Sequence, residues 1–231
     1  MIKGFRGTSL VDFPGKIASV IFTYTCNFRC PYCYNVELVN PEYYQNLETL
    51  PEETILKELK RRKGFIKGVV ITGGEPTLWG KKLVSLLEKI KVESDLAIKL
   101  DTNGSQPELV KFLIENKLID YLALDFKTSP KRYGEVGGNF EKVKKTLFLL
   151  EKFLENSEVR ITLYPPLVGF KELKEMLPFL KGIKNLALQK FLPEKTLKEE
   201  RVKPYKLEFY QKIHAYLEEK LPEVKIWVRY E

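Results

Sequence analysis

The chain has 231 residues, of which 44% are hydrophobic, and carries 39 Lys and Arg against 31 Asp and Glu, a formal net charge of +8. This size and composition exclude a disordered chain and suit one α/β domain or two small ones. No apolar run is long enough to cross a membrane, and residues 1–5 lack the apolar core of a signal peptide, so we expect a cytoplasmic protein. The basic residues are spread over helical patterns, which favours a solvated surface over a nucleic-acid site or an acidic partner.

Strands and helices are predicted to alternate along the chain. Periodicity and proline positions predict strands at 17–23, 68–72, 96–100, 121–124, 159–164, 186–189 and 225–229, with helices at 51–63, 80–91, 107–116, 139–155, 171–180 and 204–220. This alternation implies parallel β–α units. Six units are too few for a complete eight-stranded barrel, so we expect an α/β fold with a partial (β/α)6 TIM-type barrel. We predict one domain over 1–231, with an N-terminal extension (1–16), a barrel core (17–192) and a C-terminal helix and strand (193–231).

All three cysteines lie directly after the first predicted strand. Cys26, Cys30 and Cys33 have the spacing C-x-x-x-C-x-x-C. Thiolates are the usual protein ligands of iron–sulfur clusters, and a full set is four. Three would leave one iron with an open position, which in metal sites usually means chemistry rather than scaffolding. A structural zinc site would need a fourth ligand, but the single histidine, His214, lies far away in a predicted helix; a disulfide would leave one thiol over.

Polar groups follow the later strands as well. The carboxyl ends of parallel strands gather the βα loops, so we expect these groups to converge on one site. Gly73 and Gly74 lack side chains, which lets a ligand approach their backbone, and Glu75 can accept hydrogen bonds from an ammonium group. A plain strand-to-helix turn is the alternative.

Asp101 and Asp125 end neighbouring strands. Two close carboxylates need a cation or a shared proton, so this pair suits acid/base work, a metal ion or an ammonium group. Lys127 lies two residues past Asp125 and can pair with a ligand carboxylate, so an amino acid suits this set of groups. Asp101 can equally be a helix cap. Tyr32 can pack against a flat ring such as adenine, or only shield the cysteines.

These motifs resemble those of the radical S-adenosylmethionine enzymes over essentially the whole chain. Residues 4–16 are similar to the start of anaerobic ribonucleoside-triphosphate reductase activating proteins, and residues 101–104 and 125–127 resemble segments of pyruvate formate-lyase activating enzyme. The chain is thus identified as a member of the glycyl-radical-enzyme activase group.

The resemblance implies a role for each motif. The three cysteines would ligate a four-iron, four-sulfur cluster whose open iron binds S-adenosylmethionine. Glu75 and the two glycines would hold the amino group of that cofactor, Lys127 its carboxylate and Tyr32 its adenine. The further expected cofactor contacts are Cys33, Tyr34, Asp101, Asn103, Asp125, Phe126, Gln189 and Phe191, and a monovalent-cation site is matched by Asp101, Thr102 and Asp125.

Two positions depart from the family pattern. Residues 189–193 contain no histidine where pyruvate formate-lyase activase has one, so Phe191 is expected to stack in its place. Tyr34 stands where relatives commonly have histidine. No cysteine is left for an auxiliary cluster, which argues against the peptide-maturing members.

The expected reaction is reductive cleavage of S-adenosylmethionine to a 5′-deoxyadenosyl radical, which takes hydrogen from a glycine of a partner enzyme. The resemblance favours anaerobic ribonucleotide reductase as this partner and a flavodoxin or ferredoxin-type protein as reductant. Two other hypotheses stay open. One is a radical enzyme acting on a small molecule, as deazapurine-forming synthases do; the other is a non-enzymatic binding module, whose affinity would fall steeply with salt.

Overall fold

The computed structural model describes residues 1–198 and 201–229. Its strands are β1 (Ile2–Ser9), β2 (Ala18–Thr23), β3 (Gly68–Gly73), β4 (Ala97–Thr102), β5 (Tyr121–Asp125), β6 (Ser157–Leu163), β7 (Asn185–Lys190) and β8 (Lys225–Arg229). Its α-helices are α1 (Val36–Val39), α2 (Pro41–Tyr44), α3 (Glu52–Arg62), α4 (Lys81–Ser94), α5 (Pro107–Glu115), α6 (Phe140–Leu149), α7 (Phe170–Met176) and α8 (Leu207–Lys220). Short 3-10 helices are η1 (Pro76–Trp79), η2 (Pro130–Val136), η3 (Leu150–Lys152), η4 (Leu154–Asn156) and η5 (Leu177–Phe179).

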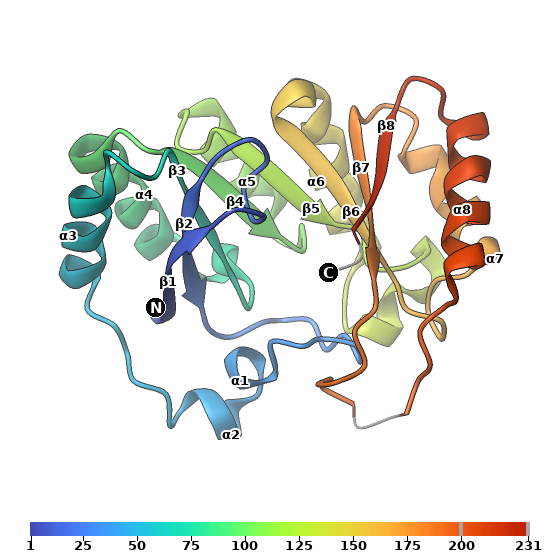
Figure 1. Cartoon of the computed structure of the whole chain (residues 1–231), viewed down its shortest axis with the longest axis horizontal. Helices are drawn as coiled ribbons and strands as arrows, with labels where there is room; N and C mark the ends of the chain where they lie inside the picture. Colours follow the sequence, from blue (N-terminus) through green and yellow to red (C-terminus); the bar gives the residue numbers. More distant parts are fainter. Residues whose placement is uncertain (199–200, 230–231) are drawn as a thin grey trace. The chain divides into compact units, whose positions relative to one another are not determined.

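The strands form one sheet in the order β1-β2-β3-β4-β5-β6-β7-β8 (Figure 1). The pairs β2–β3, β3–β4, β6–β7 and β7–β8 are parallel, as the alternation of strands and helices predicted. Strand β1 was not predicted, because residues 1–16 were assigned only as an N-terminal extension. It pairs antiparallel with β2, with Phe5 opposite Ile21. Burial does not alternate along β1, and the strand contains Gly4 and Gly7, so its sequence lacks the pattern typical of a half-buried strand.

The chain is divided into two compact units. Unit 1 comprises Met1–Asn27, Glu37–Thr102 and Gln106–Leu122, and unit 2 comprises Phe28–Val36, Asn103–Ser105 and Ala123–Glu231. Strand β5 contributes its first two residues to unit 1 and its remainder to unit 2. One domain over 1–231 stays a prediction.

Each unit buries its strands beneath amphipathic helices. In unit 1, α4 buries Leu83, Leu86, Leu87 and Ile90, which lie on one face of the helix. In unit 2, α8 buries Tyr210, Ile213 and Leu217 in the same spacing. None of the helices among the described residues is long and apolar enough to span a membrane.

Three predicted helices are at least three residues shorter than expected. The one predicted at 204–220 begins only at Leu207. The helix predicted at 139–155 begins at Phe140 after the cap Asn139, whose side chain accepts a hydrogen bond from the Glu141 N–H at 2.9 Å, but it gives way to η3 after Leu149. The helix predicted at 171–180 ends at Met176, shortly before Pro178, which cannot donate the next helical hydrogen bond.

Candidate functional site

The cysteine loop follows β2. Cys26 lies three residues beyond the end of this strand and belongs to unit 1, whereas Cys30 and Cys33 belong to unit 2. The N–H of Cys33 donates to the carbonyl of Cys30 at 3.0 Å, which closes a tight turn between these two cysteines. Cys30 is buried and the other two are half-buried; none of the three forms a disulfide.

Charge and burial act in opposite directions on the thiol of Cys33. Its pKa is raised, first by burial and to a smaller degree by the Asp125 carboxylate, while the ammonium group of Lys127 and the backbone at Asn35 lower it. A nearby cation favours the thiolate form, which is the form that binds metal. Lys127 thus offsets part of the burial that favours the neutral thiol of Cys33, and three cysteine thiols are the type of donor that iron–sulfur sites use.

The geometry of a metal site is a separate matter. In the part of the chain that the structure describes, no three His, Cys, Asp or Glu side chains are gathered closely enough to hold one metal ion. Ligation of a cluster by Cys26, Cys30 and Cys33 therefore stays a prediction from their thiol chemistry and spacing.

The two glycines after β3 serve the packing of the main chain. A Cβ at Gly73 would lie 2.2 Å from the carbonyl oxygen of Thr23, and a Cβ at Gly74 would lie 1.9 Å from that of Thr25. Hydrogen bonds from the Gly74 and Glu75 N–H groups to these same oxygens, at 2.9 and 2.8 Å, draw the two segments together. The close neighbour of both glycines is thus the end of β2 and the chain leaving it, which favours the structural alternative of a strand-to-helix turn over the approach of a ligand.

Glu75 is only 1% exposed and its carboxylate is tightly held. Its Oε1 accepts hydrogen bonds from the N–H of Thr77 at 3.1 Å, from the hydroxyl of Thr77, and from the hydroxyl of Thr102 at 2.8 Å. This side chain caps η1 and ties it to the end of β4. Its orientation is therefore fixed by groups of the protein itself.

Asp101 forms an ion pair with Lys99, which is 1% exposed. Both side chains belong to β4 and lie two residues apart, so they share one face of the strand. Together with the bond from Thr102 to Glu75, this pair engages two of the three residues expected to bind a monovalent cation. The structure gives a protein cation as the partner of Asp101, so it lends the cation site no support.

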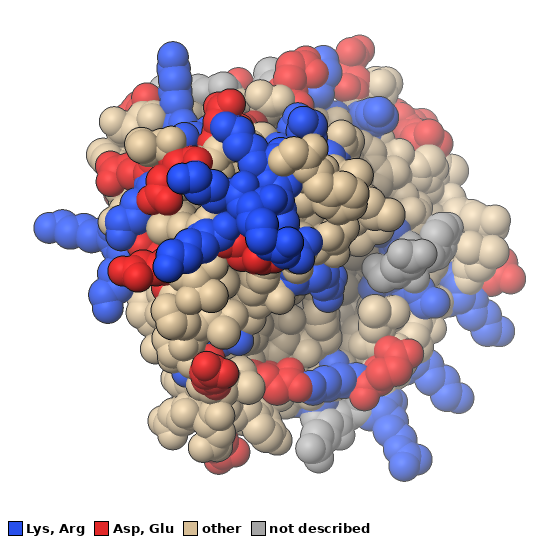
Figure 2. Space-filling view, turned by 60° about the vertical axis from the view of Figure 1, so that its left-hand side comes forward, with Lys and Arg blue, Asp and Glu red and all other residues tan. Residues whose placement is uncertain are grey.

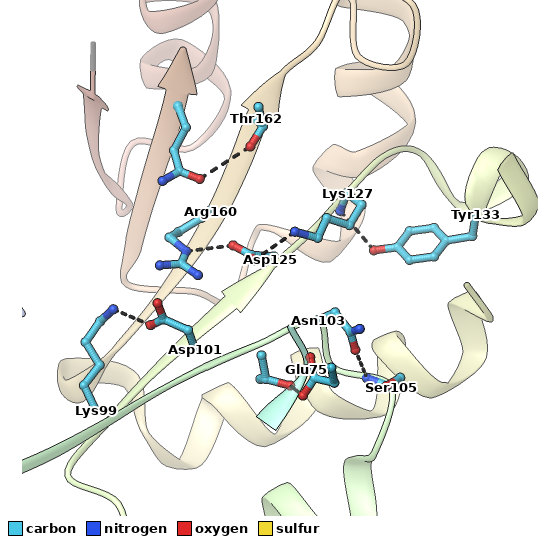
Figure 3. A network of polar contacts seen from close by, with 12 residues as sticks. Glu75, Lys99, Asp101, Asn103, Ser105, Asp125, Lys127, Tyr133, Arg160 and Thr162 are labelled. Atoms are coloured by element: carbon cyan, nitrogen blue, oxygen red, sulfur yellow. Dashed lines mark hydrogen bonds and ion pairs between the residues drawn. The ribbon is translucent and has the colours of Figure 1, made fainter. Parts of the chain in front are cut away.

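Asp125 lies between two cations (Figure 3). Its Oδ1 accepts from Arg160 Nε at 2.7 Å and its Oδ2 from Lys127 Nζ at 2.9 Å. Burial opposes the charged form of Asp125, but Arg160 and Lys127 outweigh it and hold the pKa far below the usual value. Burial likewise opposes the charge of Lys127, yet Asp125 and Cys30 raise its pKa. The lowered pKa favours the charged carboxylate of Asp125, and of the three alternatives left open by the sequence its partners favour an ammonium group over acid/base work.

The aromatic residues of the site form a chain of contacts in unit 2. Phe191 is 1% exposed and meets the ring of Tyr164 edge-on, with the two ring centroids 4.8 Å apart. The ring of Tyr164 packs in turn against that of Tyr32, with a distance of 5.2 Å between their centroids. The hydroxyl of Tyr32 is buried and has no hydrogen-bond partner among the described residues. Phe191 thus packs against Tyr32 indirectly, through Tyr164. Of these three aromatic residues, Tyr32 is the one whose buried hydroxyl lacks a described hydrogen-bond partner.

The remaining predicted contacts differ in burial and in partners. Phe126 is fully buried among Tyr133, Phe140 and Phe179, so its side chain belongs to the core. Asn103 accepts from the Ser105 N–H at 2.9 Å, Gln189 accepts from Thr162 at 3.5 Å, and Tyr34 is 64% exposed.

Sequence reasoning missed the cationic partners Lys99 and Arg160. Both are charged residues within apolar strands, and such a residue needs a buried partner. That rule could have located them, because each strand offers few other reasons for a positive charge. Sequence reasoning also missed Tyr133, whose hydroxyl accepts from the Lys127 N–H at 3.2 Å.

The chain is similar to known proteins over most of its length. The family model described as "Radical SAM superfamily" matches residues 20–180. MJ1227 of Methanocaldococcus jannaschii, which is named as a glycyl-radical enzyme activating enzyme, is 31% identical over 207 residues, covering 87% of this chain and 83% of that protein. A pyruvate formate-lyase-activating enzyme of Clostridium pasteurianum is 29% identical over 210 residues, which cover 85% of this chain and 82% of that protein.

A solved structure supports the fold. SuiB of Streptococcus suis bound to S-adenosylmethionine has a TM-score of 0.70 at 17% identity, covering 91% of this chain. The chain spans about half the length of that protein, since it covers 50% of it. The radical SAM type of α/β fold, the partial barrel predicted from the sequence, is confirmed by these matches. The chain belongs to the radical SAM superfamily.

Proposed function

We propose that this protein activates a partner enzyme by removing a hydrogen atom from one of its glycines. The observation that carries this proposal is the three-cysteine loop, found in a chain whose relative of nearly the same span is named as a glycyl-radical enzyme activating enzyme. When bound at that loop, a four-iron, four-sulfur cluster supplies the electron that cleaves S-adenosylmethionine into methionine and a 5′-deoxyadenosyl radical, the species that attacks the glycine.

The residues of the chain would hold and orient these groups. Cys26, Cys30 and Cys33 would supply the thiolates. The Glu75 carboxylate, fixed by its bonds to Thr77 and Thr102, would receive the amino group of S-adenosylmethionine together with the backbone of Gly73 and Gly74.

Lys127 and Tyr32 would hold the other end of the cofactor. The pKa of Lys127 is raised, so its ammonium group is charged at any physiological pH; it has three donors and spends one on Asp125. It can therefore also bind a carboxylate. The buried hydroxyl and ring of Tyr32 offer a polar and a flat apolar surface to adenine.

The identity of the partner is a finer part of the proposal. The similarity of residues 4–16 to reductase activating proteins favours anaerobic ribonucleotide reductase, with a flavodoxin or ferredoxin-type protein as the electron donor. Relatives named pyruvate formate-lyase-activating enzyme favour another glycyl radical enzyme instead.

A second candidate is chemistry on a small molecule. A 7-carboxy-7-deazaguanine synthase of Thermococcus kodakarensis is 30% identical, but over only 44% of this chain. The activating enzymes match about twice that share, so we rank the small-molecule reaction second.

Anaerobic reconstitution and dithionite reduction, followed by an assay for 5′-deoxyadenosine, test the proposal. Wild type is expected to cleave S-adenosylmethionine, and a Cys30→Ala variant is not. Adding the candidate reductase should then give a glycyl radical detectable by electron paramagnetic resonance. A cluster-loaded protein without any cleavage would contradict the radical chemistry; cleavage that responds only to small molecules would favour the second candidate.

A further inference from the structure

The segment between β7 and α8 contains neither helix nor strand in its described residues, 191–198 and 201–206. Connections of this length are uncommon in compact proteins and are usually functional when they are ordered. Two aromatic residues anchor it within unit 2. Phe191 is buried against Tyr164 at its start, and at its end the Tyr205 hydroxyl donates to the carbonyls of Val168 at 3.2 Å and Pro165 at 3.4 Å.

The middle of this segment is bonded to the cysteine loop. The N–H of Leu197 donates to the carbonyl of Cys33 at 3.0 Å, and the N–H of Lys198 donates to the carbonyl of Pro31 at 3.0 Å. These residues lie more than 160 positions from the cysteines in sequence, so the contact is not a consequence of local chain geometry. The two bonds hold the same turn that the Cys33-to-Cys30 bond closes.

A side chain maintains the bend that makes both bonds reachable. Consecutive N–H groups of an extended strand point to opposite sides, so Leu197 and Lys198 can face one loop only if the chain bends there. The Thr196 hydroxyl donates to the Lys198 carbonyl at 2.6 Å across this bend. Such side-chain bonds stabilise tight turns.

We infer that Thr196, Leu197 and Lys198 form a clamp that positions the Cys30–Cys33 turn before any cluster binds. The clamp satisfies two carbonyls of the loop, which would otherwise need water beside a buried cysteine. It holds the Cys33 side of the loop, through the carbonyls of Cys33 and Pro31. Preorganisation of ligands is what a metal site requires of the residues around it. The inference concerns the protein without cofactor, so it holds or fails independently of the proposed function.

The reactivity of each thiol in the apoprotein tests the clamp. Iodoacetamide is added under anaerobic, reducing conditions, and alkylation of each cysteine is followed by peptide mass spectrometry. Leu197→Pro removes the donor to Cys33, and Thr196→Val removes the hydroxyl that holds the bend. We expect alkylation of Cys33 to become about five-fold faster in Leu197→Pro, as for loss of one net hydrogen bond, and about two-fold faster in Thr196→Val, with Cys26 unchanged.

Two matched controls accompany these variants. Thr196→Ser keeps the hydroxyl and should behave as wild type. Lys203→Pro places proline in the same segment. Among the residues that the structure describes, the Lys203 N–H has no bond to the cysteine loop, so this variant should also leave Cys33 unchanged. Unchanged Cys33 reactivity in both Leu197→Pro and Thr196→Val would overturn the clamp. Equal acceleration at all three cysteines in both variants would also overturn it, because the segment would then stabilise the fold rather than this turn.

Discussion

Asp125 illustrates how single residues set the charge of the site. Its two oxygens are shared between Arg160 and Lys127, and all three side chains are largely buried. A buried ion pair stabilises little relative to apolar residues, but removing one member leaves a charge without compensation. In this triad the anion compensates two cations, so its removal is the more damaging change.

Asp125→Asn is therefore expected to lower the free energy of unfolding of the apoprotein by about 2–4 kcal/mol. Urea unfolding followed by circular dichroism measures this change. Glu135→Gln is the matched control, because the Glu135 carboxylate that it removes is 51% exposed in its pair with Arg132, and the change should cost less than about 1 kcal/mol. If both variants lost the same free energy of unfolding, the buried triad of Asp125, Arg160 and Lys127 would contribute no more to stability than the more exposed pair.

The same residue predicts a pH dependence. The folded pKa of Asp125 is lowered, so in acid the unfolded chain binds this proton more readily than the folded one. Its contribution is complete above the unfolded pKa of about 4 and is lost as pH falls through the folded pKa. The difference in unfolding free energy between wild type and Asp125→Asn should thus be constant from about pH 7 to 5 and shrink below about pH 4. A difference that grows on acidification would reverse the assigned direction of the shift.

At the scale of elements, the junction of β2 and β3 in unit 1 is held by close main-chain contacts. Gly73 has a φ of +114°, and Gly74 packs on the carbonyl of Thr25. The residue Thr25 also has a positive φ, of +67°. A non-glycine residue with positive φ is uncommon, so the close approach here is maintained by the surrounding bonds. Placement of Glu75 depends on this junction, because its N–H is bonded to Thr25.

Gly73→Ala is expected to destabilise the apoprotein by about 2–4 kcal/mol, because its Cβ would meet main chain that cannot move aside. Thermal unfolding monitored by circular dichroism measures the loss. Gly64→Ala is the control, since its Cβ would meet nothing within 4 Å, and it should change stability by less than about 1 kcal/mol. If Gly73→Ala were as stable as this control, the main chain at the junction could move to accommodate a Cβ. The close approach of a ligand would then be the better explanation for glycine at this position.

At the scale of the whole molecule, the sequence predicted the features that depend on a local pattern of residues. It did not predict those that depend on which distant residues come into contact. The parallel strands were predictable because each is a short apolar run, and the cysteine loop because its spacing is local. Strand β1 was not, since its pairing with β2 rather than its own pattern makes it a strand. Likewise, the partners of Asp101 and Asp125 depend on which side chains the strands bring together.

The net charge of +8 is a property of the whole surface, and it carries the last prediction. Figure 2 shows Lys and Arg side chains crowded in the upper part of one face, with acidic residues among them. Exposed Arg61, Lys63 and Lys67 at and after the end of α3 contribute basic charge, while Arg61 also pairs with Glu58. Such a surface attracts any polyanion at low salt without recognising it.

We therefore expect weak binding to a short labelled DNA duplex at about 50 mM salt and its loss by about 200 mM, measured by fluorescence anisotropy. Lys63→Glu should weaken the low-salt binding more than Lys212→Glu on α8, because Lys63 has other basic residues close by in sequence. Phosphate contacts release counterions, so binding made of them alone must fall steeply with salt. Binding that survives about 200 mM salt would contradict a merely solvated surface and would reopen a nucleic-acid role for this chain.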